Sequence, residues 1–90
     1  MPDEKYFKAL DVVLNKKYPL YSYSLNGYQE ESVCLEKIDD KWVVFMGERG
    51  NRYDEEFCNT PLLACITMIR YLTHNQEEIR NMEEEFLSIL

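Results

Sequence analysis

The chain of 90 residues is the length of one domain, and we expect residues 1–90 to form a single folded unit. Its 17 acidic and 10 basic residues leave a net charge of −7. This balance argues against a protein that binds nucleic acid or an anionic membrane, since both need basic patches, whereas a basic protein partner fits it. Solubility alone would also account for the charge, and it is the more common explanation for acidic proteins.

Three cysteines, Cys34, Cys58 and Cys65, lie among apolar residues. A small secreted protein held by disulfides usually has an even number of cysteines, so free thiols packed as small apolar side chains are the simpler interpretation. The start of the sequence shows no signal-peptide pattern, and no apolar run reaches the ~18 residues of a membrane span. We therefore expect a cytoplasmic protein with no membrane partner.

The first predicted helix starts after Asp3, whose side chain can cap free N–H groups of the first turn. Tyr6, Leu10 and Val13 fall at helical spacing and give the segment one apolar face. Pro19 disfavours the helical conformation at the residue before it, so the helix ends before that point.

Two strands joined by a hairpin are predicted next. Residues 21–25 alternate large apolar and small polar side chains, as a half-buried strand does. Asn26 and Gly27 both tolerate a positive φ, so they predict a tight turn into a second strand over residues 32–38.

Residues 41–46 are the most apolar run of the chain, and their lack of alternation predicts a central strand covered on both faces. After a turn at residues 47–51, residues 52–58 are a candidate fourth strand. Its alternation would place Tyr53, Glu55 and Phe57 on one face, against Asp54, Glu56 and Cys58 on the other. Its charge suits the edge of a sheet, where acidic side chains discourage further pairing.

Two helices are predicted after the strands. Thr60 followed by Pro61 is a typical helix start, and an apolar stripe at helical spacing follows it. Asn75 and Glu78 together resemble a capping box and predict a second start, although a single bent helix over residues 61–89 is the alternative. The sequence therefore predicts an α+β fold: an N-terminal helix, an antiparallel meander of three to four strands, and two C-terminal helices packed on one sheet face.

The chain contains no residue pattern typical of catalysis or of a bound cofactor. Its one histidine, His74, falls at the junction of the last two helices, where a cap on helix carbonyls is the usual role. Cys58, Cys65 and His74 lack the spacing of a zinc site, and the segment from Gly47 to Gly50 lacks the glycines and the lysine of a phosphate-binding loop. We expect no catalytic residues, no metal and no cofactor, and therefore a protein that is not an enzyme.

The candidate binding residues are an acidic band and a group of tyrosines. An acidic patch with aromatic anchors fits a basic protein partner, and tyrosine is enriched at interfaces. The alternatives are an ordinary solvated strand edge for the charges and the filling of a sheet face for Tyr21 and Tyr23. The predicted partner-binding residues are Glu48, Tyr53, Asp54, Glu55, Glu56, Tyr21 and Tyr23.

Residues 42–50 read WVVFMGERG, a polar segment follows to Phe57, and the next predicted helix carries Ala64, Cys65 and Leu72. This pattern resembles small immunity proteins of bacterial polymorphic-toxin and contact-dependent growth inhibition systems. It covers residues 42–72 of the chain, and the ERG tripeptide is its best-defined motif.

The resemblance implies an antitoxin, a cytosolic protein that binds a cognate toxin domain tightly and blocks its active site. Toxins of this class are frequently nucleases with basic grooves, in which an acidic inhibitor presents carboxylates where phosphates would lie. The residues also fit a small adaptor or regulatory subunit of a protein complex, or an acidic nucleic-acid mimic. We expect a basic toxin domain as the partner, with no nucleic acid or membrane bound.

Overall fold

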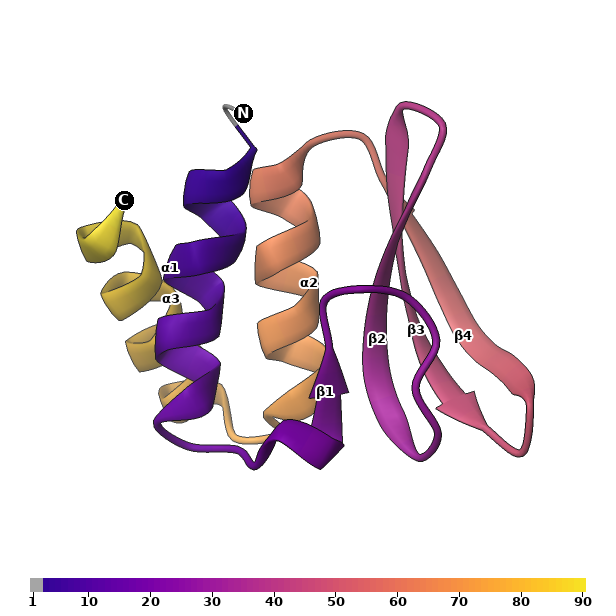
Figure 1. The fold of residues 1–90 in the computed structure, drawn as a ribbon. Coiled ribbons are helices and arrows are strands. Elements are labelled where there is room, and N and C mark those ends of the chain that lie inside the picture. The colour runs from indigo at the N-terminus through magenta and orange to yellow at the C-terminus, as the bar shows by residue number, and fades with distance from the viewer. Residues whose placement is uncertain (1–2) are drawn as a thin grey trace.

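The computed structural model describes residues 3–90, which form helices on one side of a four-stranded sheet (Figure 1). The elements in chain order are α1 (Glu4–Asn15), the 3₁₀ turn η1 (Leu20–Ser22), β1 (Tyr23–Ser24), β2 (Ser32–Ile38), β3 (Lys41–Glu48), β4 (Asn51–Cys58), α2 (Pro61–Leu72) and α3 (Gln76–Ile89). The strands lie in the order β1-β2-β3-β4. The predicted α+β class is confirmed.

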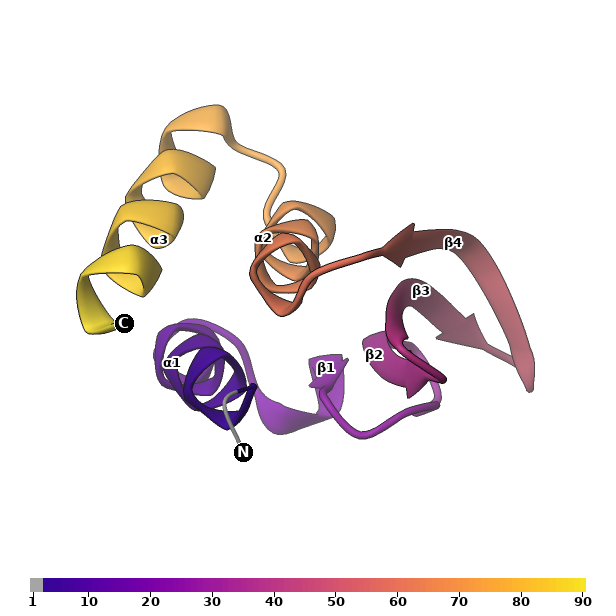
Figure 2. The same ribbon diagram turned by 90° about the horizontal axis from the view of Figure 1, so that it is seen from above.

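Helix α2 lies between the sheet and α3, with α1 beside α2 at the β1 edge of the sheet (Figure 2). It packs on β2, β3 and β4, whereas α3 packs against α1 and α2. The shared core contains Leu10 of α1, Val44 of β3, Met68 of α2 and Phe86 of α3, all buried. The prediction that both C-terminal helices pack on the sheet is therefore correct for α2 and wrong for α3, because α2 and α1 already cover that face, where Phe7 of α1 contacts Trp42 of β3.

Side-chain caps fix the starts of both C-terminal helices. The Thr60 hydroxyl accepts the Leu63 N–H at 3.1 Å, and the Asn75 side chain accepts the Glu78 N–H at 3.1 Å. Each cap satisfies a donor that has no partner within its helix, so two helices form rather than one bent helix. The predicted cap at Asp3 is wrong: its backbone is already helical, and its side chain makes no capping hydrogen bond.

The first strand and its hairpin differ from the prediction. Only Tyr23 and Ser24 are extended, and they pair with β2 in parallel, so no hairpin forms at Asn26 and Gly27. The Ser24 hydroxyl accepts the Asn26 N–H at 3.2 Å, and this local bond bends the chain directly after β1. Gly27 has a positive φ of +99°, but it lies in a loop, residues 25–31, on the sheet face opposite α2 (Figure 2).

Loop 25–31 covers the face of β3 that α2 leaves open. The Tyr28 ring stacks on Phe45 with ring centroids 6.4 Å apart. The Arg52 guanidinium lies 4.3 Å from the centre of the Phe45 ring while it pairs with Glu36. The side chains buried in this second, smaller core are Cys34, Val43 and Phe45. Strand β3 is therefore covered on both faces, as its apolar run predicts.

The close approach of loop 25–31 to β3 depends on Gly47. A Cβ atom added at this residue would lie 2.6 Å from the Gln29 carbonyl oxygen and 3.1 Å from the Tyr28 ring. The first distance is well inside van der Waals contact with a backbone atom, so no side chain fits while the loop stays in place.

We predict that Gly47→Ala destabilises the protein by about 2–3 kcal/mol, because the loop must move away from β3 and give up the contact between Tyr28 and Phe45. Urea unfolding measures the change. A thiol reagent gives a second readout, since a displaced loop uncovers Cys34, which is fully buried in the native protein.

The matched control is Gly50→Ala at the β3–β4 turn. There the added methyl group meets nothing within 4 Å, and the expected loss is only the backbone strain of a left-handed residue, about 1 kcal/mol. Wild-type stability and wild-type thiol protection in Gly47→Ala would contradict the role assigned to this glycine.

Candidate functional site

Strand β4 forms one edge of the sheet, and its outer side faces solvent (Figure 1). The side chains of residues 51–57 are all exposed, and Cys58 is the first buried residue of the strand. Together with the turn from β3, this edge carries Glu48, Tyr53, Asp54, Glu55 and Glu56, which are five of the predicted binding residues.

A bulge in β4 determines which way these residues face. Between two paired positions, β4 has two residues, Asp54 and Glu55, where β3 has one, Phe45. Asp54 adopts a left-handed φ of +54°, which aspartate tolerates better than most residues. The extra residue shifts the alternation by one, so Tyr53 and Glu56 both lie on the face that α2 covers. The predicted alternation is therefore wrong from the bulge onward.

Tyr71 of α2 fixes the bulge from the covered face. Its hydroxyl donates to the Asp54 carbonyl oxygen at 2.5 Å. Burial raises the pKa of the Tyr71 hydroxyl, and the nearby Glu56 and Asp54 carboxylates raise it further, so the group stays a protonated donor. The middle of β4 is thus held in place while its acidic side chains remain in solvent.

The acidic side chains of this hairpin lack positive partners. We call Glu48, Asp54, Glu55 and Glu56 the hairpin carboxylates. Among residues 3–90, no lysine or arginine forms an ion pair with any of them, and the arginine of β4, Arg52, is engaged by Glu36. The acidic helix α3 differs, since its ion pairs are Lys17–Glu78 at 2.6 Å, Lys16–Glu85 at 2.5 Å and Arg70–Glu83 at 3.3 Å. Negative charge is therefore less compensated on the hairpin than on α3.

Exposed apolar side chains accompany the hairpin carboxylates. Tyr53 is 45% exposed and lies beside Met46 of β3, which is also exposed. On the other face of β4, Phe57 is 59% exposed. Aromatic side chains within a charged surface are common anchors of protein interfaces. The exposure of Met46 was not predictable from the sequence, because an apolar residue at the end of an apolar run gives no sign that the covering helix stops short of it.

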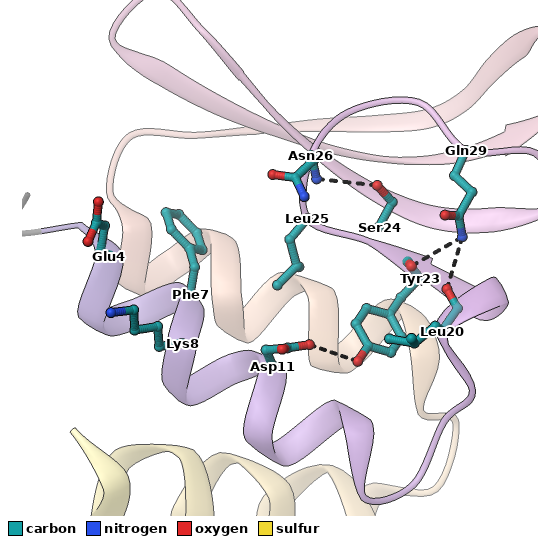
Figure 3. A pocket seen from close by; sticks show the side chains of 10 residues that line it. All are labelled: Glu4, Phe7, Lys8, Asp11, Leu20, Tyr23, Ser24, Leu25, Asn26 and Gln29. Atoms are coloured by element: carbon teal, nitrogen blue, oxygen red, sulfur yellow. Dashed lines mark hydrogen bonds between the residues drawn. The ribbon is translucent and has the colours of Figure 1, made fainter.

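The two tyrosines predicted as binding residues lie in different environments. Tyr23 is only 4% exposed, and its hydroxyl donates to Asp11 Oδ1 at 2.9 Å (Figure 3). It belongs to the core, which is the alternative that the sequence left open. Tyr21, in η1, is 78% exposed and presents its ring to solvent.

A groove of about 580 Å³ separates α1 from the chain segment that contains β1 (Figure 3). Phe7 and Lys8 of α1 line one side, and Leu25 and Leu20 line the other. Leu20 is 67% exposed and was not singled out by the sequence analysis. Leu20 lies outside any segment with a periodic apolar pattern, so the sequence indicated its exposure only through its position directly after Pro19.

The three cysteines are buried free thiols. Burial raises the pKa of each thiol, that of Cys65 to about 12, so all three stay protonated near neutral pH. His74 is exposed after the end of α2, where the Thr73 N–H closes the helix on the Ile69 carbonyl oxygen at 2.9 Å. Within the described residues, no His, Cys, Asp and Glu side chains are grouped to hold a metal ion, and no helix has the length and apolar character to cross a membrane.

Comparison with known proteins gives no match to a family model, to a curated protein or to a solved structure.

We predict that the protein loses stability as the pH rises above 9. The fold raises the pKa of Cys65 from 9.0 to about 12 and that of Tyr23 from 10.0 to about 12. Both groups stay protonated in the folded protein after they ionise in the unfolded chain, so their contribution is complete below pH 9 and decreases from there toward pH 12. Urea unfolding at a series of pH values measures this decrease.

The Tyr23→Phe variant separates the two groups. It should be less stable at neutral pH because Asp11 loses its donor, but it should lose less of its stability between pH 10 and pH 12 than the wild-type protein does. An unchanged decrease in this range would show that Tyr23 is not held protonated by the fold.

Proposed function

We propose that this protein is an immunity protein, an antitoxin that binds a cognate toxin domain and blocks its active site by tight association. The toxin domain is a nuclease with a basic substrate groove, and the hairpin carboxylates occupy this groove in place of phosphates. The protein acts in the bacterial cytoplasm and catalyses no reaction itself. The resemblance of residues 42–72 to such proteins and the surface of the β3–β4 hairpin both support the proposal.

The strongest support comes from the hairpin carboxylates, which are exposed and have no lysine or arginine partner among residues 3–90. Three of them lie on β4, the strand that Tyr71 fixes. Uncompensated negative charge speeds the encounter with a basic protein, because the attraction acts before contact. A fixed strand also loses little conformational entropy when it is bound. Helix α3 is a weaker candidate, since its ion pairs neutralise much of its charge within the molecule.

A nucleic-acid mimic fits the surface less well than a protein-binding antitoxin does. Mimicry needs carboxylates at regular spacing along one face, and the bulge at Asp54 and Glu55 interrupts the spacing on β4. A small adaptor subunit would use the same surface and differs from the antitoxin in its partner.

The first test concerns the partner. The polypeptide encoded immediately upstream of this protein's gene is expressed alone and together with this protein. We expect growth arrest in the first case, normal growth in the second, and a stable 1:1 complex after purification. A stable complex without growth arrest would support the adaptor instead, and a polypeptide that neither binds nor harms cells would refute the proposal.

The second test locates the interface through charge. We predict that Glu55→Lys/Glu56→Lys slows association with the upstream polypeptide by about tenfold at low salt and weakens the dependence of the association rate on salt. Asp54 is left unchanged because its left-handed φ suits aspartate. Stopped-flow or surface-binding kinetics at several salt concentrations give the rates.

The matched control is Glu77→Lys/Glu84→Lys on α3, which changes the net charge by the same amount. Neither glutamate forms an ion pair among residues 3–90, so no contact within the protein is broken. We expect a smaller effect on the association rate than in the β4 variant. Equal effects, or an effect in the control alone, would move the interface away from β4.

A further inference from the structure

We propose that Leu20 and Tyr21 are the apolar anchors of this interface, and that the partner presents an apolar pocket bordered by basic residues. The inference rests on the proposed function and specifies the partner surface that the function requires. The hairpin carboxylates then speed the encounter, and η1 holds the complex together.

Leu20 and Tyr21 are both strongly exposed to solvent. At 67% and 78%, Leu20 and Tyr21 have the highest exposed fractions of the large apolar side chains in residues 3–90. They are consecutive in η1, and Leu20 also lines the groove beside α1, so the apolar surface continues past the turn (Figure 3). Single exposed apolar residues are ordinary, but a contiguous apolar surface is typical of an interaction site.

Hydrogen bonds fix the backbone conformation of η1. The Leu20 carbonyl oxygen accepts the Gln29 side-chain amide at 3.1 Å, and the Tyr21 carbonyl oxygen accepts the Ser32 hydroxyl at 2.8 Å. These bonds hold the backbone of η1 against the start of β2. A partner would therefore lose little affinity to ordering this backbone.

The 3₁₀ turn η1 lies at the same end of the molecule as the β3–β4 turn (Figure 1). Ser32, which holds Tyr21, pairs with Gly47 of β3 just before that turn. The Ser32 hydroxyl also contacts the Glu30 carbonyl oxygen, and the Glu30 carboxylate accepts the Arg49 N–H. Ser32 and Glu30 thus link the anchors to the hairpin, and one partner surface can contact both.

The charges at this end determine the chemistry of the partner. Glu30, Glu31 and Glu48 are exposed there and outnumber Arg49. Lys16 and Lys17, which precede η1, are paired with Glu85 and Glu78, so a basic rim is the complementary surface. Glu31 and Arg49 both have a φ of +52°, which is uncommon for residues other than glycine, asparagine and aspartate. At Arg49 this φ is the one that the two-residue turn between β3 and β4 requires, since Gly50 beside it also has a positive φ, of +77°.

The test compares Leu20→Ala and Tyr21→Ala with Leu87→Ala in the complex with the upstream polypeptide. Leu87 lies on α3 and is 51% exposed, so its truncation removes a similar side chain from a different surface. We expect the dissociation rate to rise by at least about tenfold for Leu20→Ala and for Tyr21→Ala, with little change in the association rate. Leu87→Ala should dissociate at the wild-type rate, and all three variants should unfold at the wild-type urea concentration.

The outcomes distinguish this inference from the proposed function. If the upstream polypeptide binds the wild-type protein and all three variants with one dissociation rate, the anchors lie elsewhere, and the inference is wrong while the proposed function stands. Faster dissociation of Leu87→Ala alone would likewise overturn it, by placing the anchor on α3. If the polypeptide does not bind the wild-type protein, the proposed function fails and the inference fails with it.

Discussion

The two-sided cover of β3 is the constraint on which the rest of the structure depends. Val44 faces α2, whereas Val43 and Phe45 face the opposite side of the sheet, and all three are fully buried. Because the helices all lie on the α2 side, loop 25–31 is the segment of residues 3–90 that covers the opposite side (Figure 2). The loop reaches β3 only because Gly47 has no side chain in its path. A hairpin between β1 and β2 would have left Phe45 in water.

The same constraint leaves β4 uncovered. Loop 25–31 reaches Phe45 through the Tyr28 ring and the Gly50 N–H through the Tyr28 hydroxyl, and α2 contacts β4 near Cys58 and, through Tyr71, at Asp54. The side chains of residues 51–57 nevertheless stay exposed. The free edge is protected from pairing with a second copy of the chain in two ways, since its bulge breaks the regular ladder and its carboxylates repel one another. Neither feature opposes a partner of the opposite charge, so the edge discriminates between self-association and a basic protein.

The sequence predicted the elements whose signals are local and missed those that depend on distant contacts. Thr60 and Asn75 carry their helix starts in adjacent residues, so α2 and α3 were predictable. The path of the chain after β1 depends on the contact between Tyr28 and Gly47, which lie in separate segments. No local sequence pattern predicts this contact. The bulge at Asp54 could not be predicted either, because its position in β4 depends on contacts with β3 and α2.

The candidate site, too, could be predicted from the sequence only where its features are local. Composition was enough to predict an acidic surface around Tyr53. Which carboxylates are unpaired could not be predicted, because Lys16 and Lys17 lie far from α3 in the sequence and reach its glutamates only after α1 and α3 pack. Tyr21 and Tyr23 also looked equivalent, since both fit one alternating strand. The 3₁₀ turn after Pro19 separates them and turns one outward and the other toward Asp11.

In the proposed interface, the hairpin carboxylates and the side chains of η1 contribute to binding in different ways. They also differ in their effect on the stability of the free protein. The carboxylates of Asp54, Glu55 and Glu56 are consecutive and repel one another, so they lower the stability of a small domain that has little to spare. A basic partner would remove this repulsion, and the complex would be more stable than the free protein. Leu20 and Tyr21 are uncharged and add no such repulsion to the free protein, while backbone hydrogen bonds hold η1 in place. In the proposed complex, the charges would govern how fast association occurs, and the anchors would govern how long the complex lasts.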